Sequence, residues 1–399
     1  MSMTPAAMVI AQSGGPTAVV NASLVGACAV GDASASVDRV LGARFGVEGL
    51  RDGDFVDLSA LSSPNLRRLR GTPGAALGSS RHRPTDEEIA SCLAVLDRHL
   101  IRWVVLIGGN DSAETLHRLH VAAVGRGSAA RFVGVPKTID NDLPHMDHAP
   151  GYGSAARYLA IAAREAGLDT CAMRRTDPIK IIEVMGRNAG WLAAASALGR
   201  ERVDDPPQII FFPERPRPVD RMLEEIRAAH AAHGWALVTI SENQRDDAGA
   251  PIGGSQPIHV DPHGHEYHES AGLALVRAVQ SRLGLRARYE RPGSLQRTSA
   301  AMLSAVDVEE AEAAGAHAAR LALRGESDVM VAIQRREGRG YAVRFGAIPL
   351  ELVAHQERRM PDEYIASSGI DVTDAYVAYG RPLIGAPLDP TFRLERRGA

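Results

Sequence analysis

Cysteine is scarce in this chain, which has three cysteines in 399 residues. Cys28, Cys92 and Cys171 lie far apart and form no CxxC pair. An odd number of widely spaced cysteines excludes a disulfide-based scaffold and a cysteine-rich zinc site, and favours buried thiols in a reducing compartment. Aromatic residues make up only 5% of the chain, whereas small and aliphatic residues are abundant, as in proteins that alternate strands and helices.

Charge of one sign is not in excess, because 45 Lys and Arg residues face 48 Asp and Glu residues, with a formal net charge of −3. This balance argues against a nucleic-acid partner. No apolar run is long enough to span a bilayer, and the first residues lack a signal-peptide pattern. We therefore expect a soluble cytoplasmic protein, and its length predicts two domains.

The chain does contain a series of glycine-bearing turns, each between a short apolar strand and a helix. The first strand, predicted at residues 8–11, ends at the SGGPT run (13–17), which contains Gly14 and Gly15. Adjacent glycines let backbone N–H groups approach an anion, and the N-terminus of the next helix adds positive potential. Glycine also serves the geometry of tight turns, so this motif alone is weak evidence for phosphate binding.

A second glycine turn follows a strand predicted at residues 103–107. Its GGNDS run (108–112) contains Gly109, Asn110, Asp111 and Ser112. Asp111 can hold a divalent cation, or this turn can simply cap the helix that follows. The residue types alone leave both interpretations open.

A basic segment, GSSRHR (78–83), precedes this strand and contains Arg81. Arginine is the side chain best shaped to hold two phosphate oxygens at once. A solvated basic turn is an equally good interpretation when the segment is taken alone.

The third turn carries the most polar chemistry. The strand predicted at residues 132–135 ends at Pro136, because proline cannot donate to a strand ladder. The functional groups beyond it belong to Lys137, Thr138, Asp140 and Asp142. An Asp-rich run by itself is more often a solvated turn, but in open α/β sheets ligands bind beyond the carboxyl ends of the strands. In the company of the other turns, this cluster predicts a catalytic site.

Further strand ends follow in the second half of the chain. A strand predicted at residues 179–184 leads into Met185, Gly186 and Arg187, and a strand at residues 236–241 ends on Glu242. Arg288 and Arg297 add two basic positions later. Repeated junctions with glycine, basic residues and carboxylates predict a phosphate-handling α/β enzyme.

Four histidines, His259, His263, His265 and His268, gather in and just after a loop rich in Gly, Pro and Asp. Their spacing has no helical HxxxH register and no cysteine accompanies them. We therefore interpret them as loop histidines in contact with solvent and expect no zinc site.

Four of these motifs resemble the successive signatures of the phosphofructokinase family: Gly14-Gly15 followed by Asn21, GGNDS, PKTIDND (136–142) and EVMGR (183–187). The resemblance extends over nearly the whole chain. It implies two Rossmann-like α/β domains with mostly parallel sheets and the active site in the cleft between them. The donor domain is expected at residues 1–152 with 298–348, and the sugar-phosphate domain at 153–297 with 349–399.

The resemblance also implies a phosphoryl donor. Members that use ATP have glycines at the positions of Asp111 and Lys137, whereas the pyrophosphate-dependent branch has an acidic residue and a lysine there. An aspartate crowds and repels the α-phosphate of a nucleotide, while lysine pairs with the smaller, highly charged pyrophosphate. The expected reaction is reversible Mg²⁺-dependent phosphoryl transfer from pyrophosphate to fructose 6-phosphate.

Residue roles follow from the same resemblance. Asp140 resembles the base that takes the proton of the sugar 1-hydroxyl, with Asp142 orienting the site. The donor residues are expected to be Gly14, Gly15, Arg81, Gly109, Asp111, Ser112, Lys137 and Thr138, with Asp111 and Asn110 nearest the metal. The acceptor residues are expected to be Thr138, Asp140, Met185, Gly186, Arg187, Glu242, Arg288 and Arg297. The last two are expected on the 6-phosphate, where one of them can be donated by a neighbouring subunit.

Three positions depart from the family pattern. Asn110 stands where an aspartate linked to magnesium is usual, and Ser294 replaces a histidine or tyrosine beside the sugar phosphate. Pro178 falls where an arginine reaches a neighbouring subunit in the family, with Arg174 and Arg175 just upstream. The resemblance nevertheless implies a homodimer or homotetramer.

Two alternatives remain at this point. An ATP-dependent sugar or lipid kinase would also use glycine-rich turns, but the other kinases with such turns lack the PKTIDND run. A catalytically silent regulatory subunit is suggested by Asn110, whereas the presence of Asp140 and Lys137 argues for an active enzyme.

Overall fold

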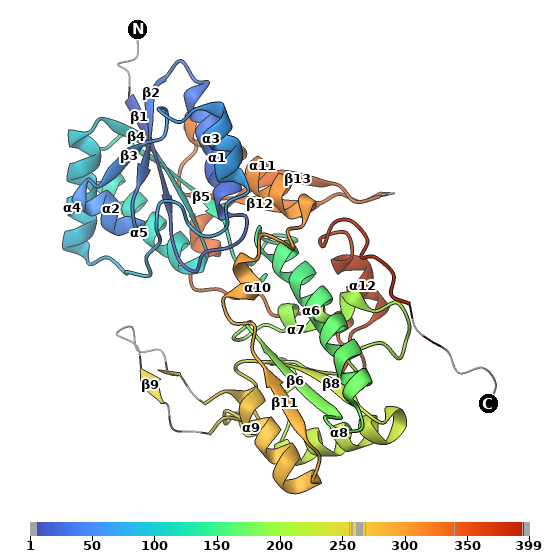
Figure 1. The fold of residues 1–399 in the computed structure, drawn as a ribbon. Coiled ribbons are helices and arrows are strands. Elements are labelled where there is room, and N and C mark those ends of the chain that lie inside the picture. The colour runs from blue at the N-terminus through green and yellow to red at the C-terminus, as the bar shows by residue number, and fades with distance from the viewer. Residues whose placement is uncertain are drawn as a thin grey trace. The chain divides into compact units, whose positions relative to one another are not determined.

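The computed structural model describes residues 6–254, 256, 258–260, 266, 267, 269–338, 340–392 and 394. The chain folds as two compact units (Figure 1). Unit 1 comprises Met1–Ala155 and Gly293–Met360, and unit 2 comprises Ala156–Pro292 and Pro361–Ala399. Residues 153–155, 293–297 and 349–360, which we expected in the sugar-phosphate domain, therefore belong to unit 1.

Unit 1 is built on a seven-stranded sheet in the order β13-β12-β5-β4-β1-β2-β3. The five central strands are parallel, and β3 and β13 pair antiparallel at the two edges. Its strands are β1 (Ala6–Gln12), β2 (Val37–Ala43), β3 (Phe55–Asp57), β4 (Ile101–Gly108), β5 (Arg131–Pro136), β12 (Val329–Arg335) and β13 (Val343–Pro349). Its helices are α1 (Val20–Asp32), α2 (Val47–Asp52), α3 (Ser63–Arg70), α4 (Asp86–Arg98), α5 (Asn110–Gly125), α10 (Leu295–Thr298), α11 (Ala305–Leu323) and the short η3 (Leu350–Leu352).

Alternate residues of each strand face opposite layers of helices, as the strand period of two requires. In β1, Ala7 and Val9 pack with α2, α4 and α5, whereas Met8 and Ile10 pack with α1 and α11. Figure 1 shows these helices on the two faces of the sheet. A sheet buried on both faces explains why its central strands are continuous apolar runs.

Helices α1 and α11 cross closely because glycine lies at both contact points. A Cβ atom at Gly26 would lie 1.9 Å from the Glu312 carbonyl oxygen, and one at Gly315 would lie 1.9 Å from the Ser23 carbonyl oxygen. Only glycine lets the two backbones approach to this distance. This contact fixes α11, which in turn carries carboxylates that support the candidate site.

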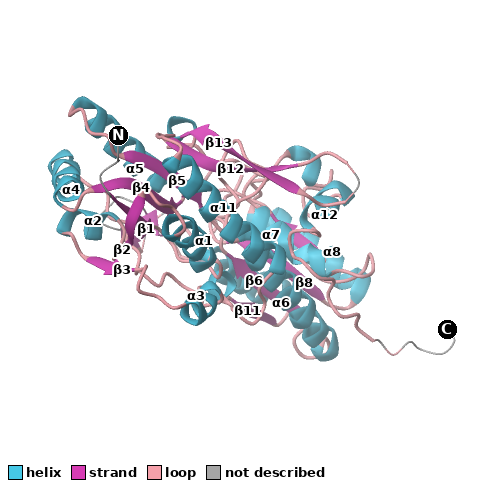
Figure 2. Ribbon diagram, turned by 90° about the horizontal axis from the view of Figure 1, so that it is seen from above, coloured by secondary structure: helices cyan, strands magenta, loops and turns pink. Residues whose placement is uncertain are grey.

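Unit 2 contains a four-stranded parallel sheet in the order β11-β6-β8-β7 (Figure 2). Its strands are β6 (Ile179–Val184), β7 (Ile209–Phe211), β8 (Ala236–Ser241) and β11 (Ala287–Glu290), and β9 (His259–Val260) pairs with β10 (Glu266–Tyr267) in a separate two-stranded sheet. Its helices are α7 (Trp191–Ala195), η1 (Ser196–Gly199), α8 (Val219–His233), α9 (Ala271–Ala278), the π-helical turn η2 (Val279–Leu283), η4 (Asp362–Tyr364) and α12 (Asp374–Gly380), together with most of α6 (Tyr152–Met173).

The core of unit 2 lies between its sheet and helices α8 and α9. Ile181, Val238 and Phe211 pack there against Met222 and Leu275. Helix α7 contacts β7 and β8. The unit thus holds the carboxyl ends of β6 and β8 next to each other, which places Glu183 and Glu242 in one neighbourhood.

Several local expectations can be compared with these elements. The strands predicted at residues 8–11, 103–107 and 132–135 are found as β1, β4 and β5, and β5 ends at Pro136 as expected. Of the four loop histidines, His259 begins β9, while His263, His265 and His268 lie outside the described residues. No helix in the described part of the chain is long and apolar enough to cross a membrane.

Candidate active site

Three adjacent strands of unit 1, β1, β4 and β5, end in the SGGPT, GGNDS and PKTIDND turns, respectively. The strand order changes direction at β1, since β2 lies on one side of it and β4 on the other. The turns are joined by backbone hydrogen bonds, from Ser13 N to Ile107 O at 2.9 Å and from Lys137 N to Gly108 O at 3.0 Å. Ligands of open α/β sheets bind at such switch points.

Three basic side chains converge on the first of these turns. Lys137 Nζ donates to the Gly15 carbonyl at 2.8 Å, while the position of a Cβ on Gly15 lies 3.2 Å from Arg297 Nη1 and 3.8 Å from Arg81 Nη2. We call Arg81, Lys137 and Arg297 the cation cluster. Gly14 has φ +77° and a Cβ there would lie 3.0 Å from Lys137 Nζ. Glycine is therefore required both by the backbone and by the approach of the lysine.

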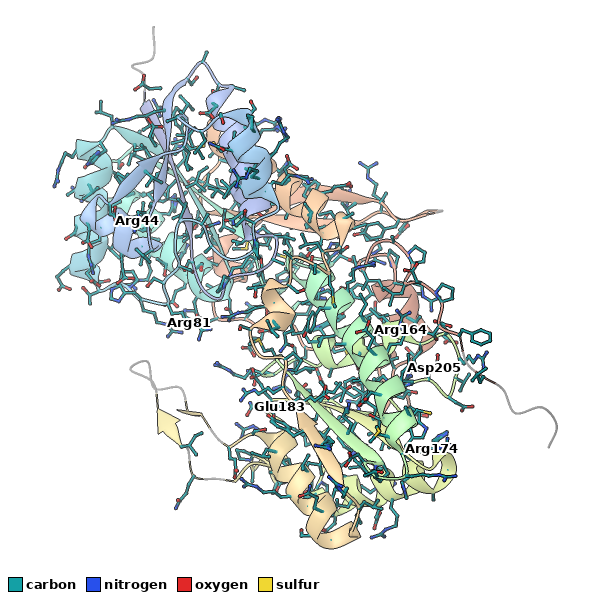
Figure 3. The ribbon with its side chains drawn as sticks, viewed as in Figure 1. Arg44, Arg81, Arg164, Arg174, Glu183 and Asp205 are labelled. Carbon is teal, nitrogen blue, oxygen red and sulfur yellow. The ribbon has the colours of Figure 1, made fainter. Side chains whose placement is uncertain are left out.

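The lysine of the cation cluster is buried, with 5% of its surface exposed. Burial lowers the pKa of Lys137 to about 8, and the charges of Arg81 and Arg297 lower it further while Asp140 opposes the change. A site that depresses a lysine pKa in this way repels cations and stabilises an anion placed among the three side chains. Arg81, whose side chain is exposed, is labelled in Figure 3.

The segment that carries the basic residue Arg81 is fixed to the first turn. Ser80 O accepts from Gly14 N at 2.9 Å, and Ser79 Oγ donates to Gly14 O at 2.5 Å. Buried Asn21 also holds this region, because its Nδ2 donates to the carbonyls of Thr72 and Gly74 at 2.8 Å. Asn21 therefore helps to position the loop that carries Arg81.

The two candidate carboxylates lie on the loop after β5. Asp140 N donates to Thr138 Oγ1 at 3.0 Å, and the Thr138 hydroxyl also bonds to the Asp142 carboxylate. Burial raises the pKa of Asp142, and the hydrogen bond from Thr138 partly offsets this. Asn141 lies between them at φ +55°, a conformation that Asn tolerates better than most residues. Thr138 thus fixes the positions of both neighbouring aspartates.

The return of this loop is anchored by helix α11 and by an arginine after η3. Asp307, fully buried on α11, accepts from Gly151 N and Ser154 N at 2.9 Å each. Arg358 donates to the carbonyls of Met146 and Asp147 at 2.6 Å. Arg358 also donates to the Asn141 carbonyl at 2.8 Å, so it holds the PKTIDND run itself as well as the return of the loop.

A buried charged group completes this support. His148 is 1% exposed and lies between two carboxylates, with Nδ1 2.7 Å from Asp147 and Nε2 2.6 Å from Glu310. Tyr341 donates to the second oxygen of Glu310 at 2.6 Å. The two carboxylates raise the pKa of His148 to about 9 against the opposing effect of burial. The imidazole is therefore charged near neutral pH.

We expect His148 to make the stability of the protein pH-dependent. Its pKa is raised from 6.5, so its contribution is complete below pH 6.5 and is lost as the pH rises through 9. Between pH 6.5 and 8 the free energy of unfolding should fall by about 2 kcal/mol. Lys137, whose pKa is lowered to about 8, makes the free energy of unfolding rise with pH, but only above about pH 8.

Urea unfolding at several pH values checks this expectation. His148→Gln should be less stable at pH 6.5 and should lose most of the slope. His355→Gln is the matched control, because His355 faces Glu114 at 3.5 Å on the surface with 67% of its side chain exposed. A wild-type stability that is constant or rises over this range would contradict the role of His148.

The GGNDS turn begins helix α5. Gly109 is its N-cap, Asn110 Oδ1 accepts from Asp111 N at 3.0 Å, and Asp111 Oδ1 accepts from Arg83 Nη2 at 2.9 Å. Ser112 approaches Gly108 so closely that a Cβ there would lie 2.0 Å from its hydroxyl oxygen. Both metal candidates, Asn110 and Asp111, thus already have partners within the turn or beside it.

The predicted acceptor residues Met185, Gly186, Arg187 and Glu242 lie in unit 2. Glu242 N donates to Val184 O at 2.9 Å, which places Glu242 beside the MGR turn. Gly186 has φ +107°, and a Cβ there would lie 2.7 Å from the Ala189 carbonyl. Arg187 is exposed just beyond the turn. The structure therefore brings these four residues to the carboxyl end of β6.

A residue that the sequence reasoning missed lies in the same place. Arg291 bridges two carboxylates, with Nε 3.2 Å from Glu183 and Nη2 3.3 Å from Glu242. Glu183 is 1% exposed and also accepts from Gly272 N at 2.7 Å (Figure 3). Burial raises the pKa of Glu242, and the charge of Arg291 opposes this change. Arg291 follows the end of β11, a position that could have identified it.

The two arginines that we expected on one phosphate lie in different units of the chain. Arg288 lies in unit 2, opposite Lys180 near the amino end of β6, and donates to Asp177 at 2.8 Å. Arg297 lies in unit 1 within the cation cluster. Within unit 2, the arginine beside Glu242 is thus Arg291 and not Arg288.

Residues 7–322 match the family described as phosphofructokinase. The chain belongs to the phosphofructokinase family. A protein of Rhodospirillum rubrum named pyrophosphate–fructose 6-phosphate 1-phosphotransferase is 38% identical over 394 residues, which are 97% of this chain and 96% of that one. A sulfofructose kinase of Alkalicoccus urumqiensis is 36% identical over 89% of this chain and 91% of its own length.

A solved structure of this phosphofructokinase family agrees with the fold. The pyrophosphate-dependent phosphofructokinase from Nitrosospira multiformis superposes with a TM-score of 0.88 at 32% identity, covering 97% of this chain and 93% of that one. This likeness confirms the predicted α/β fold with mostly parallel sheets.

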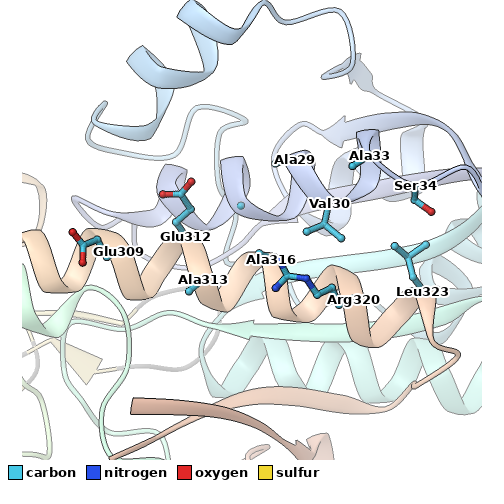
Figure 4. Close-up of a pocket in the computed structure, with 11 residues that line it drawn as sticks. Ala29, Val30, Ala33, Ser34, Glu309, Glu312, Ala313, Ala316, Arg320 and Leu323 are labelled. Carbon is cyan, nitrogen blue, oxygen red and sulfur yellow. The ribbon is translucent and has the colours of Figure 1, made fainter. Parts of the chain in front are cut away.

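One groove of unit 1 is separate from the residues above. It lies between α1 and α11 and has a volume of about 770 Å³ (Figure 4). Its lining is mainly aliphatic, with Val30 and Leu323 among its members, and the charged Glu309, Glu312 and Arg320 at its border. None of the family motifs contributes to this groove, so we assign the chemistry to the turns at the sheet edge.

Proposed function

We propose that this member of the family catalyses reversible phosphoryl transfer from pyrophosphate to the 1-hydroxyl of fructose 6-phosphate. The observation that carries the proposal is the cation cluster around Gly14 and Gly15, with Lys137 buried in it. Three cations over a glycine turn suit a small, highly charged donor. The name of the Rhodospirillum rubrum relative supports the same donor and acceptor, and that of the Nitrosospira multiformis structure supports the same donor.

The donor is distinguished from ATP by two side chains. Asp111 stands on the first turn of α5, and its side chain takes the space beside the donor turn that a nucleotide α-phosphate would need. Lys137 gives a positive charge close to the shorter pyrophosphate. Together they favour pyrophosphate both by size and by charge.

Catalysis then follows from the loop after β5. Asp140 takes the proton from the sugar 1-hydroxyl as that oxygen attacks the terminal phosphorus, and Asp142 and Thr138 hold Asp140 in position. The cation cluster stabilises the charge on the transferred phosphoryl group and on the departing phosphate. Because one phosphoanhydride is exchanged for one phosphate ester with little change in total charge, the reaction is expected to run readily in both directions.

Magnesium fits this site as an ion carried by the donor. No group of three or more His, Cys, Asp or Glu residues in the described parts of the chain could hold a metal by itself. Mg²⁺ is commonly held by one or two carboxylates plus substrate phosphates, and Asp111, Asp140 and Asp142 offer such oxygens. Bound there, the ion would neutralise phosphate charge. Arg83 competes for Asp111, so we place the metal nearer to Asp140 and Asp142 than the sequence suggested.

The acceptor is assigned to the end of β6 in unit 2. Glu242 is proposed to accept hydrogen bonds from sugar hydroxyls, and Met185, Gly186 and Arg187 form the surrounding turn. Arg291 compensates the charges of Glu183 and Glu242, so the exposed Arg187 is proposed to attract an anionic sugar. Arg288, which is 58% exposed, is proposed to serve a neighbouring subunit of a homodimer or homotetramer.

A cytoplasmic location is also proposed. Cys28, Cys92 and Cys171 are free thiols, which suits a reducing compartment.

Donor exchange tests the proposed function directly. With fructose 6-phosphate and Mg²⁺, pyrophosphate should support turnover and ATP should not. Asp111→Gly, alone or with Lys137→Gly, should relax the exclusion of ATP because it removes the bulk of the side chain beside the donor turn. Sulfofructose serves as the alternative acceptor in the same assay. Equal or faster turnover of the wild-type protein with ATP would reject the donor assignment.

A further inference from the structure

Arg83 forms an ion pair with the residue that excludes nucleotides. Its Nη2 lies 2.9 Å from Asp111 Oδ1. Arg83 belongs to the same segment as Ser80, which binds Gly14, and as Arg81 of the cation cluster. Asp111 follows the Gly108-Gly109 turn, where a Cβ on Gly109 would lie 3.6 Å from the Lys137 carbonyl oxygen. The pair therefore joins two of the segments that surround the proposed donor.

The backbone of Arg83 is held from both sides. On one side His82 N donates to Ser80 Oγ at 3.0 Å, and on the other Arg118 Nη1 donates to Pro84 O at 2.7 Å. Thr85 then caps α4 in a capping box. An arginine on a fixed backbone beside a fixed helix start keeps its side chain within reach of the carboxylate.

The segment that follows Arg83 runs along one face of α5. Asp111 and Arg118 are separated by two helical turns, so they share a face of the helix. Asp111 contacts Arg83, while Arg118 contacts both Pro84 and Asp86, at 2.7 Å each. Two arginine–carboxylate pairs, Arg83–Asp111 and Arg118–Asp86, therefore hold the same segment. Because only the first involves Asp111, Arg118 provides a matched control for Arg83.

The charge of Asp111 raises a difficulty for a pyrophosphate site. A carboxylate beside the donor turn repels the multiply charged pyrophosphate as well as a nucleotide. Exclusion by size alone requires that the carboxylate be neutralised. The guanidinium of Arg83, in direct contact with Asp111, supplies the compensating charge.

We propose that Arg83 is a donor-selectivity residue that acts through Asp111. It neutralises the carboxylate, so that Asp111 keeps its bulk against nucleotides without weakening the attraction between the cation cluster and pyrophosphate. The inference rests on the proposed donor site. The pair is half exposed, at 47% for Arg83 and 65% for Asp111, so its loss should leave the stability of the protein nearly unchanged.

Steady-state kinetics with pyrophosphate test this role. Arg83→Ala should raise KM for pyrophosphate by roughly three- to tenfold, with kcat changed less than about twofold, and the rise should shrink at high salt. Arg83→Lys should recover most of the loss because it restores the charge. In an Asp111→Asn background, Arg83→Ala should change KM by less than about twofold, since no carboxylate remains to be neutralised.

Arg118→Ala is the matched control, because it removes the other arginine from the same segment and leaves the Arg83–Asp111 pair. Its KM for pyrophosphate should stay near the wild-type value. An equal rise for Arg118→Ala would assign the effect to the order of the segment and overturn the proposal. An equal rise in KM for Arg83→Ala in the wild-type and the Asp111→Asn protein would show that Arg83 contacts the donor itself, which contradicts the proposal. No rise in KM in either protein would show that the ion pair has no effect on donor binding, which contradicts it as well.

The wild-type assay separates this inference from the function beneath it. Failure of the wild-type protein to use pyrophosphate rejects the donor assignment and this proposal with it. Wild-type turnover with pyrophosphate, followed by unchanged kinetics in Arg83→Ala, rejects the role of Arg83 alone.

Discussion

Replacing Asp140 with Asn should lower kcat by roughly two to four orders of magnitude and leave KM for fructose 6-phosphate nearly unchanged. The amide has the shape of the carboxylate but cannot accept the sugar proton, so the loss belongs to the transition state. This range corresponds to about 3–5 kcal/mol of activation free energy. The loop itself should persist, because Asp140 is positioned through its backbone N–H on Thr138 and through the anchors Asp307 and Arg358.

The neighbouring aspartate provides the comparison. Asp142→Asn should reduce kcat less, because Asp142 binds the Thr138 hydroxyl and acts on the site through it. Steady-state rates for both variants in both reaction directions give the answer. Near-normal kcat for Asp140→Asn, together with a large loss for Asp142→Asn, would move the base to Asp142.

Arg297→Ala should raise KM for pyrophosphate by roughly ten- to a hundredfold, since a charge-assisted contact to phosphate is worth about 1.5–3 kcal/mol. The structure motivates this choice of substrate, because Arg297 lies with Arg81 and Lys137 at the first glycine turn. Removing one of three cations should weaken the binding of a highly charged donor more than that of the sugar phosphate.

Arg297→Lys is the companion variant and should recover only part of the loss, since a point charge does not reproduce the fork geometry of a guanidinium. KM values for both substrates must be measured with each variant. A rise confined to fructose 6-phosphate would return Arg297 to the 6-phosphate of the acceptor, the role that the family resemblance implied.

Local sequence determined the elements of the site and their order. Apolar runs of four to eight residues predicted β1, β4, β5, β6 and β8, and the glycine turns were visible because positive φ angles and close backbone approaches require glycine. The PKTIDND run also placed Lys137 and Asp140 just beyond a strand end. These features depend on windows of a few residues, so they can be inferred without knowing how the chain folds back.

Tertiary structure decided which long side chains meet. Arg297 was expected on the 6-phosphate of the sugar, and the return of the chain through α10 brings it close to Gly15. Arg291 and Arg83 gained their roles in the same way, through carboxylates from distant segments. No periodicity encodes such meetings, because an arginine reaches several ångströms from its backbone and its partner is set by the packing of elements far apart in the chain.

The buried support behind the catalytic loop was equally invisible in the sequence. His148 and Asp307 are polar residues without a motif, and only the close crossing of α1 and α11, allowed by Gly26 and Gly315, brings α11 to the loop that it holds. The sequence by itself therefore determined the chemistry offered at each strand end. The fold decided how these groups are combined, because charge compensation and preorganisation arise between segments that meet only in three dimensions.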